Sequence, residues 1–558
     1  MGSKLATLDY VVFMFYFVIV SGYGWYIYNK KRRTAESSAD YFLAEGSLTW
    51  WAIGASLIAS NISAEQFIGM SADGFQIGLA IATYEWMAAA TLMVVAIWFM
   101  PMYLKNHIFT MPQFLRQRYS PTVALIMACF WLLLYVVVNL TSILYLGAIA
   151  VQALSGLNFT LCMTFLAIFA VLISIGGMKV IGYTDVIQVV FLIFGGLVTT
   201  VLVLNMVSNA YGTTGAFNGL MEIARQAPDH LHMIIKRDNP NFASLPGITV
   251  LIGGMWITNI NYWGFNQYIT QRALGANLQT ARSGLLFAAF LKLFMPVIIV
   301  IPGIAAYVLH QHGMFQTEML GKDGTLNKDN AYPVLLNLLG PGLRGLSFAA
   351  LTAAIVASLA GKANSISTIF TLDIFKNYIK KDASEKQLVQ MGRTIIVVAL
   401  IIAIIIAPML GIDKKGGFSF IQEYTGFISP GVVATFMLGF FWKRTTANAA
   451  LFGIFGGFLM SMLFKFIPDY VNLGWLYDFG FAAKNAGGVY EIPFLDRMGF
   501  VFVLTVLGMY LITVLDPRSV NNPKGLEVPR EMFKTSRGFA IGAAIILAIL
   551  LGIYGYFW

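Results

Sequence analysis

Four polar residues interrupt an apolar stretch that runs from about residue 50 to 72: Asn61, Ser63, Glu65 and Gln66. A continuous lipid-facing helix does not tolerate such a cluster near its centre, because amide and charged groups are costly in hydrocarbon. An unwound segment beside a cavity does tolerate it, since its freed carbonyls can bind a cation while its amides meet a polar solute. The pattern therefore predicts a broken helix and a binding site at 61–66.

A second apolar stretch, about 246–269, is interrupted in the same way. It contains Thr258, Asn259, Asn261, Tyr262, Gly264, Asn266 and Gln267. Two broken helices at corresponding positions indicate an inverted repeat, with the binding site at the interface of its halves. The alternative is that both polar clusters are faces used for helix packing.

Two ionisable residues lie deep in other apolar stretches, Glu85 and Lys292. Each costs about 2.5 to 3.5 kcal/mol at a helix centre, so each should face a partner or a hydrated cavity. A carboxylate, an ammonium and amides such as Gln66 suit a polyhydroxyl solute, and Tyr262 and Trp263 could cover the apolar face of a sugar ring. The same groups would also suit an amino acid or another polar metabolite, and a purely structural ion pair is a further alternative.

The elements that must position these residues are membrane spans. Of the 558 residues 58% are hydrophobic and 11% charged, against roughly 25% charged in a soluble protein. Apolar runs of about 20 residues, enough to cross a bilayer, recur along the whole chain. We expect fourteen spans, at about 8–28, 50–72, 78–101, 122–153, 159–176, 183–208, 246–269, 281–309, 343–372, 393–411, 417–441, 446–467, 495–515 and 536–557.

The distribution of Lys and Arg predicts the orientation. Loops on the side of residues 30–33 hold about twice as many basic residues as the opposite loops, which predicts that both termini lie outside the cytoplasm of a cell (inner) membrane protein. The net charge of +10 is therefore assigned to loops facing the cytoplasm and not to nucleic-acid binding. No phosphate-binding G-x-x-x-x-G-K-[ST] motif occurs, so uphill transport would use an ion gradient.

Several separated segments closely resemble the sodium/solute symporter family. They are Ala59–Met70, Tyr84–Met87, Tyr183–Gln188, Asn259–Gln267 and Phe441–Thr445. The resemblance covers nearly the whole chain. It implies an all-α, LeuT-type inverted repeat of five plus five helices, with repeats at 50–245 and 246–445. One helix would precede them in 1–49 and three would follow in 446–558.

The resemblance also implies roles for individual residues. A sugar site would consist of Asn61, Gln66, Glu85, Asn259, Lys292 and Gln422. It would be closed inward by Tyr262 and outward by Met70, Tyr84 and Phe418. Sodium would bind carbonyl oxygens of Ala59, Ile62 and Ala354 and the hydroxyl of Ser358, with Asp185 on its inward exit path.

Three positions depart from the family pattern. Ala88 stands where a sugar-transporting member has a serine, and Ala357 replaces one of two adjacent serines at the sodium site. Lys362 lies one turn beyond Ser358, at about 6 Å of helical rise. This cation could weaken or replace sodium, or it could point into the cytoplasmic vestibule and stay hydrated.

The predicted function is sodium-coupled symport of a galactose- or glucose-like sugar by alternating access. Sodium-independent or proton-coupled sugar transport, and a sugar sensor on the same fold, are the alternatives. No metal motif and no nucleophile with a nearby base point to an enzyme, and no cofactor is expected apart from the coupling sodium ion. The expected partners are the sugar, sodium and the lipid bilayer.

Overall fold

The chain folds as one helical bundle in a computed structural model, which describes residues 5–31, 37–44, 48–321, 324–409, 417–485, 487–521 and 523–558. Within these ranges the β-structure consists of one antiparallel hairpin, β1 (Ala483–Lys484) with β2 (Tyr490–Glu491), and an isolated bridge between Leu320 and Leu326. The all-helical prediction is confirmed.

The elements of the first half are α1 (Thr7–Lys31), α2 (Ser38–Leu43), α3 (Trp50–Asn61), η2 (Glu65–Met70), α4 (Ser71–Ile77), η3 (Leu79–Ala82), α5 (Thr83–Val94), η4 (Val95–Phe99), α6 (Met100–Lys105), α7 (Met111–Arg118), α8 (Pro121–Leu133), η5 (Leu134–Leu140), α9 (Thr141–Ser155), α10 (Phe159–Ser174), α11 (Gly177–Ala210), α12 (Ala216–Gln226) and η6 (Pro228–Leu231).

The elements of the second half are α13 (Thr249–Ile252), α14 (Gly254–Gly264), α15 (Gln267–Leu274), α16 (Leu278–Lys292), α17 (Met295–Gln311), η7 (Lys328–Asn330), α18 (Ala331–Asn337), α19 (Leu343–Thr368), η8 (Ile369–Ile379), α20 (Glu385–Ile406), η9 (Ala407–Met409), α21 (Gly417–Gly426), α22 (Ser429–Phe441), α23 (Ala447–Leu451), η11 (Phe452–Gly456), α24 (Gly457–Phe466), η12 (Ile467–Asp469), α25 (Gly474–Asp478), α26 (Phe494–Leu515), α27 (Arg518–Asn521), η13 (Arg530–Phe533) and α28 (Arg537–Tyr556).

Ten helices among the described residues are long and apolar enough to cross a membrane, and α10 and α22 are shorter apolar helices. The two remaining predicted spans, at 50–72 and 246–269, are the interrupted ones. Some helices extend past their apolar run: α20 begins eight residues before the predicted span, because Ser384 and Gln387 form a capping box there.

The first interruption is a break in the helix, as predicted. α3 ends at Asn61, Ile62 is extended with φ −78° and ψ 111°, and a π-helical turn, η2, begins at Glu65. In the second stretch α14 ends at Gly264 and Asn266 is extended before α15. Asn259 and Tyr262 remain helical, so this break lies a few residues later than the polar cluster's centre.

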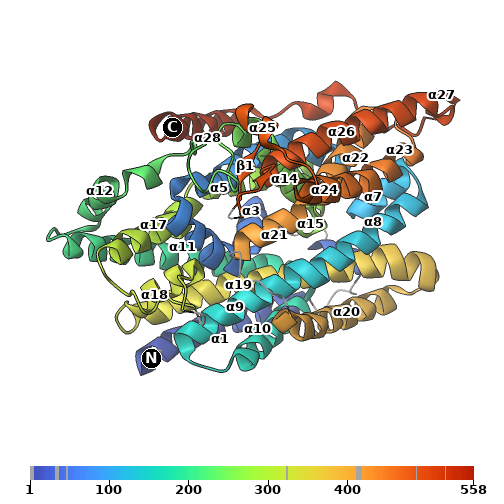
Figure 1. Cartoon of the computed structure of the whole chain (residues 1–558). Helices are drawn as coiled ribbons and strands as arrows, with labels where there is room; N and C mark the ends of the chain where they lie inside the picture. The colour runs from blue at the N-terminus through green and yellow to red at the C-terminus, as the bar shows by residue number, and fades with distance from the viewer. Residues whose placement is uncertain are drawn as a thin grey trace.

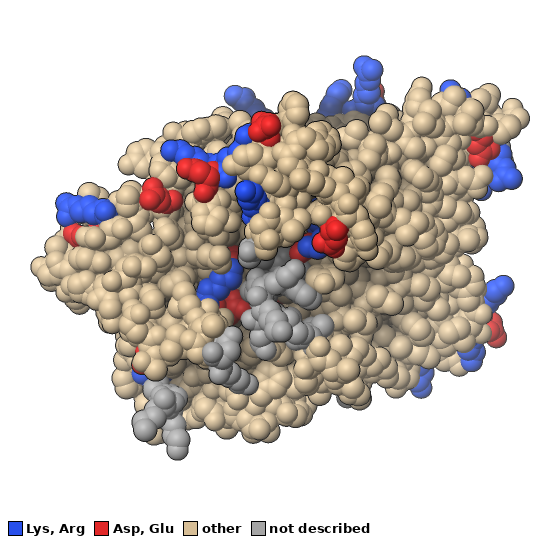
Figure 2. Space-filling model, viewed as in Figure 1, with Lys and Arg blue, Asp and Glu red and all other residues tan. Residues whose placement is uncertain are grey.

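The arrangement of the helices matches an even number of crossings. Figure 1 shows α1 beginning and α28 ending on one side of the bundle, near α12 and α18, while α7 and α27 lie at the opposite end. α3 lies near the middle of this bundle. Most of the face in Figure 2 carries no charged residue, as the perimeter of a membrane-embedded bundle requires.

A close crossing of α3 with α16 holds the first broken helix against the helix that carries Lys292. A Cβ on Gly54 would lie 2.6 Å from the Phe287 ring and 2.8 Å from the Gly284 carbonyl. A Cβ on Gly284 would lie 2.7 Å from the Ile53 side chain. Small residues permit such contacts between transmembrane helices.

We therefore expect Gly54→Val to separate α3 from α16 and to lower the melting temperature of the purified protein by several degrees, because overpacking costs about 1 to 3 kcal/mol. Thermal unfolding in detergent measures this. Gly552→Val on α28 is the matched control, since a Cβ there meets nothing within 4 Å. Equal melting temperatures for the two variants would contradict the close crossing.

Candidate functional site

The side chain of Gln66, which follows the break after α3, stabilises the unwound turn. The Gln66 Oε1 accepts hydrogen bonds from the Ser63 amide and the Ser63 hydroxyl, both at 2.9 Å. The Ser63 hydroxyl also accepts from the Glu65 amide at 3.1 Å. These bonds replace helical bonds lost in the unwound turn, so Gln66 lies at the predicted site but its oxygen is engaged by the backbone.

The two deeply placed ionisable residues meet at the end of α3. The Lys292 ammonium donates to Glu85 Oε2 and to Asn61 Oδ1 and lies 5.0 Å from the ring centroid of Trp263. Lys292 is 0% exposed and Glu85 3%. Three of the six predicted sugar-site residues therefore form one buried, charge-neutral cluster.

The aromatic residues predicted to act as gates form two contacting pairs. The Tyr262 ring contacts that of Trp263, with centroids 5.1 Å apart. Tyr84, which precedes Glu85 in the chain, meets the Phe418 ring edge to face at 5.0 Å. Phe418 also packs on the backbone next to Met70, where a Cβ on Gly69 would lie 2.6 Å from it. Two of the predicted outward-gate residues, Tyr84 and Phe418, therefore contact each other, and the gating roles stay predictions.

Asn259 and Gln422 lie outside the cluster's network of contacts. The buried Asn259 amide donates to the Met255 carbonyl, one turn earlier in α14. Gln422 lines a separate polar cavity of about 40 Å³ together with Tyr262 and Glu65. Their sugar-binding roles stay predictions.

Three of the four predicted sodium ligands, Ala59, Ile62 and Ser358, place their oxygens close together at the same break. The Ser358 hydroxyl lies 3.4 Å from the Ala59 carbonyl oxygen, 2.9 Å from that of Ser60 and 3.3 Å from that of Ile62. Hard oxygens of this kind are the ligands of small hard cations. These residues fit a sodium ion, because carbonyls released from helical bonding surround a hydroxyl from α19.

Other features of this region were missing from the sequence-based prediction. The Ser60 hydroxyl is buried without a hydrogen-bond partner among the described residues, and the Ser60 carbonyl also accepts from the Tyr268 hydroxyl. Ala354 and Ala357 are fully buried on α19. Ser56 and Ser60 are four residues apart, and so are Tyr268 and Arg272. This spacing predicts that each pair lies on one polar face of its helix.

Asp185 is part of a buried ionic cluster next to these oxygens. The Ser56 hydroxyl donates to its Oδ2 at 2.5 Å, and the Arg272 guanidinium lies 3.7 Å from the same oxygen. Arg272 also donates to the Ser56 carbonyl and to the Tyr268 carbonyl. Arg272 lies beyond the predicted end of the span at 269, but it is 1% exposed inside α15, because the second broken helix continues to Leu274.

Lys362 does not point into a hydrated vestibule, so that alternative is wrong. It is 4% exposed, and its ammonium donates to Asn139 Oδ1 at 3.1 Å. The ammonium also lies over the rings of Tyr268, at 4.4 Å, and Tyr135, at 5.6 Å. The π-helical segment η5 supplies Asn139 and Tyr135 and encloses the charge.

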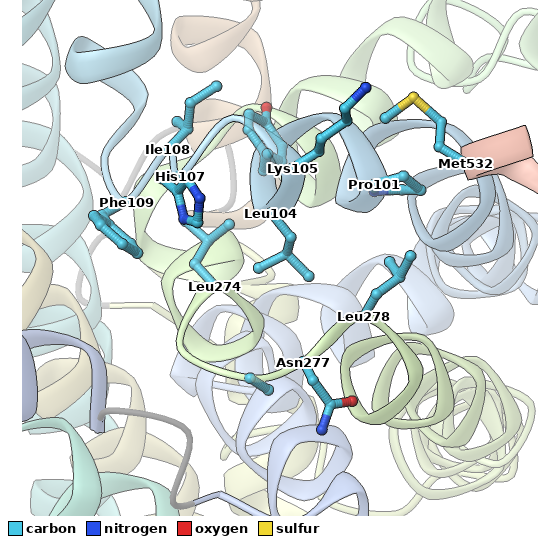
Figure 3. Close-up of a pocket in the computed structure, with 12 residues that line it drawn as sticks. Pro101, Leu104, Lys105, His107, Ile108, Phe109, Leu274, Asn277, Leu278 and Met532 are labelled. Carbon is cyan, nitrogen blue, oxygen red and sulfur yellow. The ribbon is translucent and has the colours of Figure 1, made fainter. Parts of the chain in front are cut away.

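A larger cavity lies away from all these residues. It measures about 530 Å³ and lies where α6 ends and where α15 passes to α16. Figure 3 shows Leu104, Leu274 and Leu278 around it, with Lys105 and His107 nearby. It contains none of the predicted site residues, so size alone does not locate the transport site.

Two broken helices that enclose a buried polar cluster and converging carbonyl and hydroxyl oxygens are typical of secondary transporters with the LeuT-type inverted-repeat fold. A model of the Sodium:solute symporter family matches residues 41–457, and the chain belongs to that family. It is a multi-pass membrane transporter and not an enzyme.

Two relatives show how far the similarity extends. The Sodium/glucose cotransporter of Vibrio parahaemolyticus is 44% identical over 561 residues, which is 99% of this chain and 99% of that protein. The human Sodium/myo-inositol cotransporter 2 is 32% identical over 486 residues, or 83% of this chain and 70% of that protein.

Solved structures match the fold. An outward-open, substrate-bound Na⁺-coupled sialic acid symporter has a TM-score of 0.75 at 21% identity, over 92% of this chain and 98% of that one. A closed nucleobase-cation-symport-1 family transporter has a TM-score of 0.51 at 12% identity, over 92% of this chain and 99% of that one.

The ion pair in the cluster generates a stability prediction. Glu85→Gln or Lys292→Met alone leaves one buried charge without its partner, which costs about 3 to 5 kcal/mol. We expect each single variant to have a lower melting temperature than the wild type. The double variant Glu85→Gln/Lys292→Met should regain most of the lost melting temperature, because both charges are gone.

Thermal unfolding of the purified proteins measures these differences. Glu531→Gln, which removes an exposed carboxylate, is the control and should melt like the wild type. A double variant as unstable as the two single variants would contradict mutual charge compensation.

Proposed function

We propose that the chain is a sodium-coupled symporter for a neutral hexose-type sugar. The observation that carries the proposal is that one broken helix supplies both sites. Its last residue, Asn61, belongs to the Lys292–Glu85 cluster, and the carbonyls of Ala59 and Ile62 surround the Ser358 hydroxyl. The names of the relatives, a glucose and a myo-inositol cotransporter, agree with a polyol as solute.

The charge of the cluster favours a neutral solute. Lys292 and Glu85 compensate each other, so the site has no spare cation for a carboxylate ligand. A sugar supplies both donors and acceptors, and its hydroxyls can replace the bonds that Lys292 makes with Asn61 and Glu85. An anionic solute would leave a buried charge without compensation, which is strongly unfavourable.

The shared helix also provides a physical route for coupling. A cation bound at the carbonyls would order the unwound turn at Ile62–Ala64 and thereby position Asn61 for the sugar. Sugar binding would in return favour the ordered turn, because thermodynamic coupling is reciprocal. One sodium ion moving through 100 mV supplies about 2.3 kcal/mol, enough for roughly 40-fold accumulation.

The remaining assignments belong to this proposal. Gln66, Asn259 and Gln422 would contact the sugar once a gate opens, with Tyr262 and Trp263 opening inward. Met70, Tyr84 and Phe418 would open outward, and Asp185 would guide sodium to the cytoplasm. Both termini would lie outside the inner membrane, with the repeats at 50–245 and 246–445.

Uptake into proteoliposomes tests the coupling. We expect labelled glucose or galactose to accumulate above the outside concentration only with an inward sodium gradient, which a sensor would not produce. Competition with pentoses, inositol and sialic acid at equal concentration should leave the anionic sialic acid the weakest competitor. Strong competition by sialic acid would contradict the neutral-solute assignment.

Removal of the Ser358 hydroxyl tests the sodium site. We expect Ser358→Ala to raise the half-saturating sodium concentration for uptake about tenfold or more, since a hard oxygen ligand is lost. Ser347→Ala is the control: it removes a buried hydroxyl of the same helix that instead bonds Thr199 at 2.5 Å. Equal sodium dependence in both variants would rule out this sodium site.

A further inference from the structure

The Lys362 ammonium lies beside the proposed sodium oxygens on the same helix. Four residues separate it from Ser358, so the two side chains share one face of α19 about 6 Å apart along the axis. Neither end of the helix is close enough for the charge to snorkel to water. The charge must therefore be stabilised where it lies.

Residues from three elements enclose this charge. Asn139 of η5 accepts from the ammonium at 3.1 Å, and the faces of Tyr268 of α15 and Tyr135 of η5 cover it. Aromatic faces and an amide oxygen stabilise a desolvated cation. The carboxylate of Glu65, in η2, interacts electrostatically with the ammonium and lines the same 40 Å³ cavity. Together these groups stabilise the Lys362 ammonium inside the bundle.

Tyr268 connects the Lys362 ammonium to the proposed sodium oxygens. One face of its ring contacts Lys362, and its hydroxyl donates to the Ser60 carbonyl. The same carbonyl accepts from the Ser358 hydroxyl at 2.9 Å. A single aromatic ring therefore separates the ammonium from the oxygens proposed to bind sodium.

The charges of the region balance before any ion binds. Lys362 is opposed by Glu65, and Arg272 by Asp185. Both cations lie against the Tyr268 ring, with the guanidinium carbon 5.1 Å from its centroid. A sodium ion would add one uncompensated positive charge. Ala357 supplies no additional hydroxyl with which to bind it.

We propose that Lys362 is a tethered cation that determines the affinity of the coupling site for sodium. Its fixed charge, held by Glu65, Asn139 and the two tyrosines, opposes sodium binding and keeps it weak. Sodium then binds at high outside concentration and leaves readily at low inside concentration. This inference rests on the proposed sodium site but not on the identity of the sugar.

Equilibrium binding of radioactive sodium to the purified full-length protein, without sugar, tests the inference. We expect Lys362→Met to bind sodium at least about tenfold more tightly, since a unit charge about 6 Å away acts strongly at an effective dielectric constant of about 20. Lys362→Arg, which keeps the charge, should bind like the wild type. Lys362→Met/Glu65→Gln, which restores the balance, should return close to wild-type affinity.

Controls separate this inference from the proposed function. Lys105→Met removes an exposed lysine and should change nothing, and Lys362→Gln is a second neutral variant if Lys362→Met folds poorly. Unchanged affinity in the neutral Lys362 variants, with binding lost in Ser358→Ala, would overturn the tethered-cation role and leave the sodium site intact. Absence of saturable binding in the wild type and every variant would overturn the sodium site itself.

Discussion

A helix that unwinds inside a bilayer exposes backbone groups that hydrocarbon cannot satisfy. The unwound turn at Ile62–Ala64 is the point where this chain meets that constraint, and much of the surrounding structure supplies the missing partners. Gln66 binds the Ser63 amide from within the same segment, while Ser358 and Tyr268 reach the Ser60 carbonyl from α19 and α15. Two helices distant in sequence are thereby fixed against the break.

The same constraint explains why the buried charges occur in neutral groups. Three such groups lie near the two helix breaks: Lys292 with Glu85, Arg272 with Asp185, and Lys362 with Glu65. A buried charge without a partner is strongly unfavourable, so each of these cationic side chains is paired with a carboxylate from another element. A solute or an ion can replace such a partner, so the polar core is suitable for transport. The same pairs also hold the helices together.

A close approach of backbones makes these exchanges possible. Gly54 and Gly284 let α3 and α16 touch, which places Lys292 at the end of α3 where the helical bonds stop. Asn266 has a similar role in the second break: it caps α15 through the Tyr268 amide and accepts from the Tyr135 hydroxyl at 2.5 Å. Each break is thus anchored to the bundle by polar side chains from other parts of the chain.

The sequence by itself determined the number of spans, the two interrupted helices and the need of Glu85 and Lys292 for a partner. These follow from local hydropathy, because the bilayer penalises polar groups wherever they occur in an apolar run. Only the tertiary structure decided where Lys362 points, that Arg272 is buried, and that Ser60 and Tyr268 lie beside the oxygens proposed to bind sodium. These contacts join residues as much as 208 and 223 positions apart, and the pairing of such distant groups depends on how helices cross, which hydropathy does not encode.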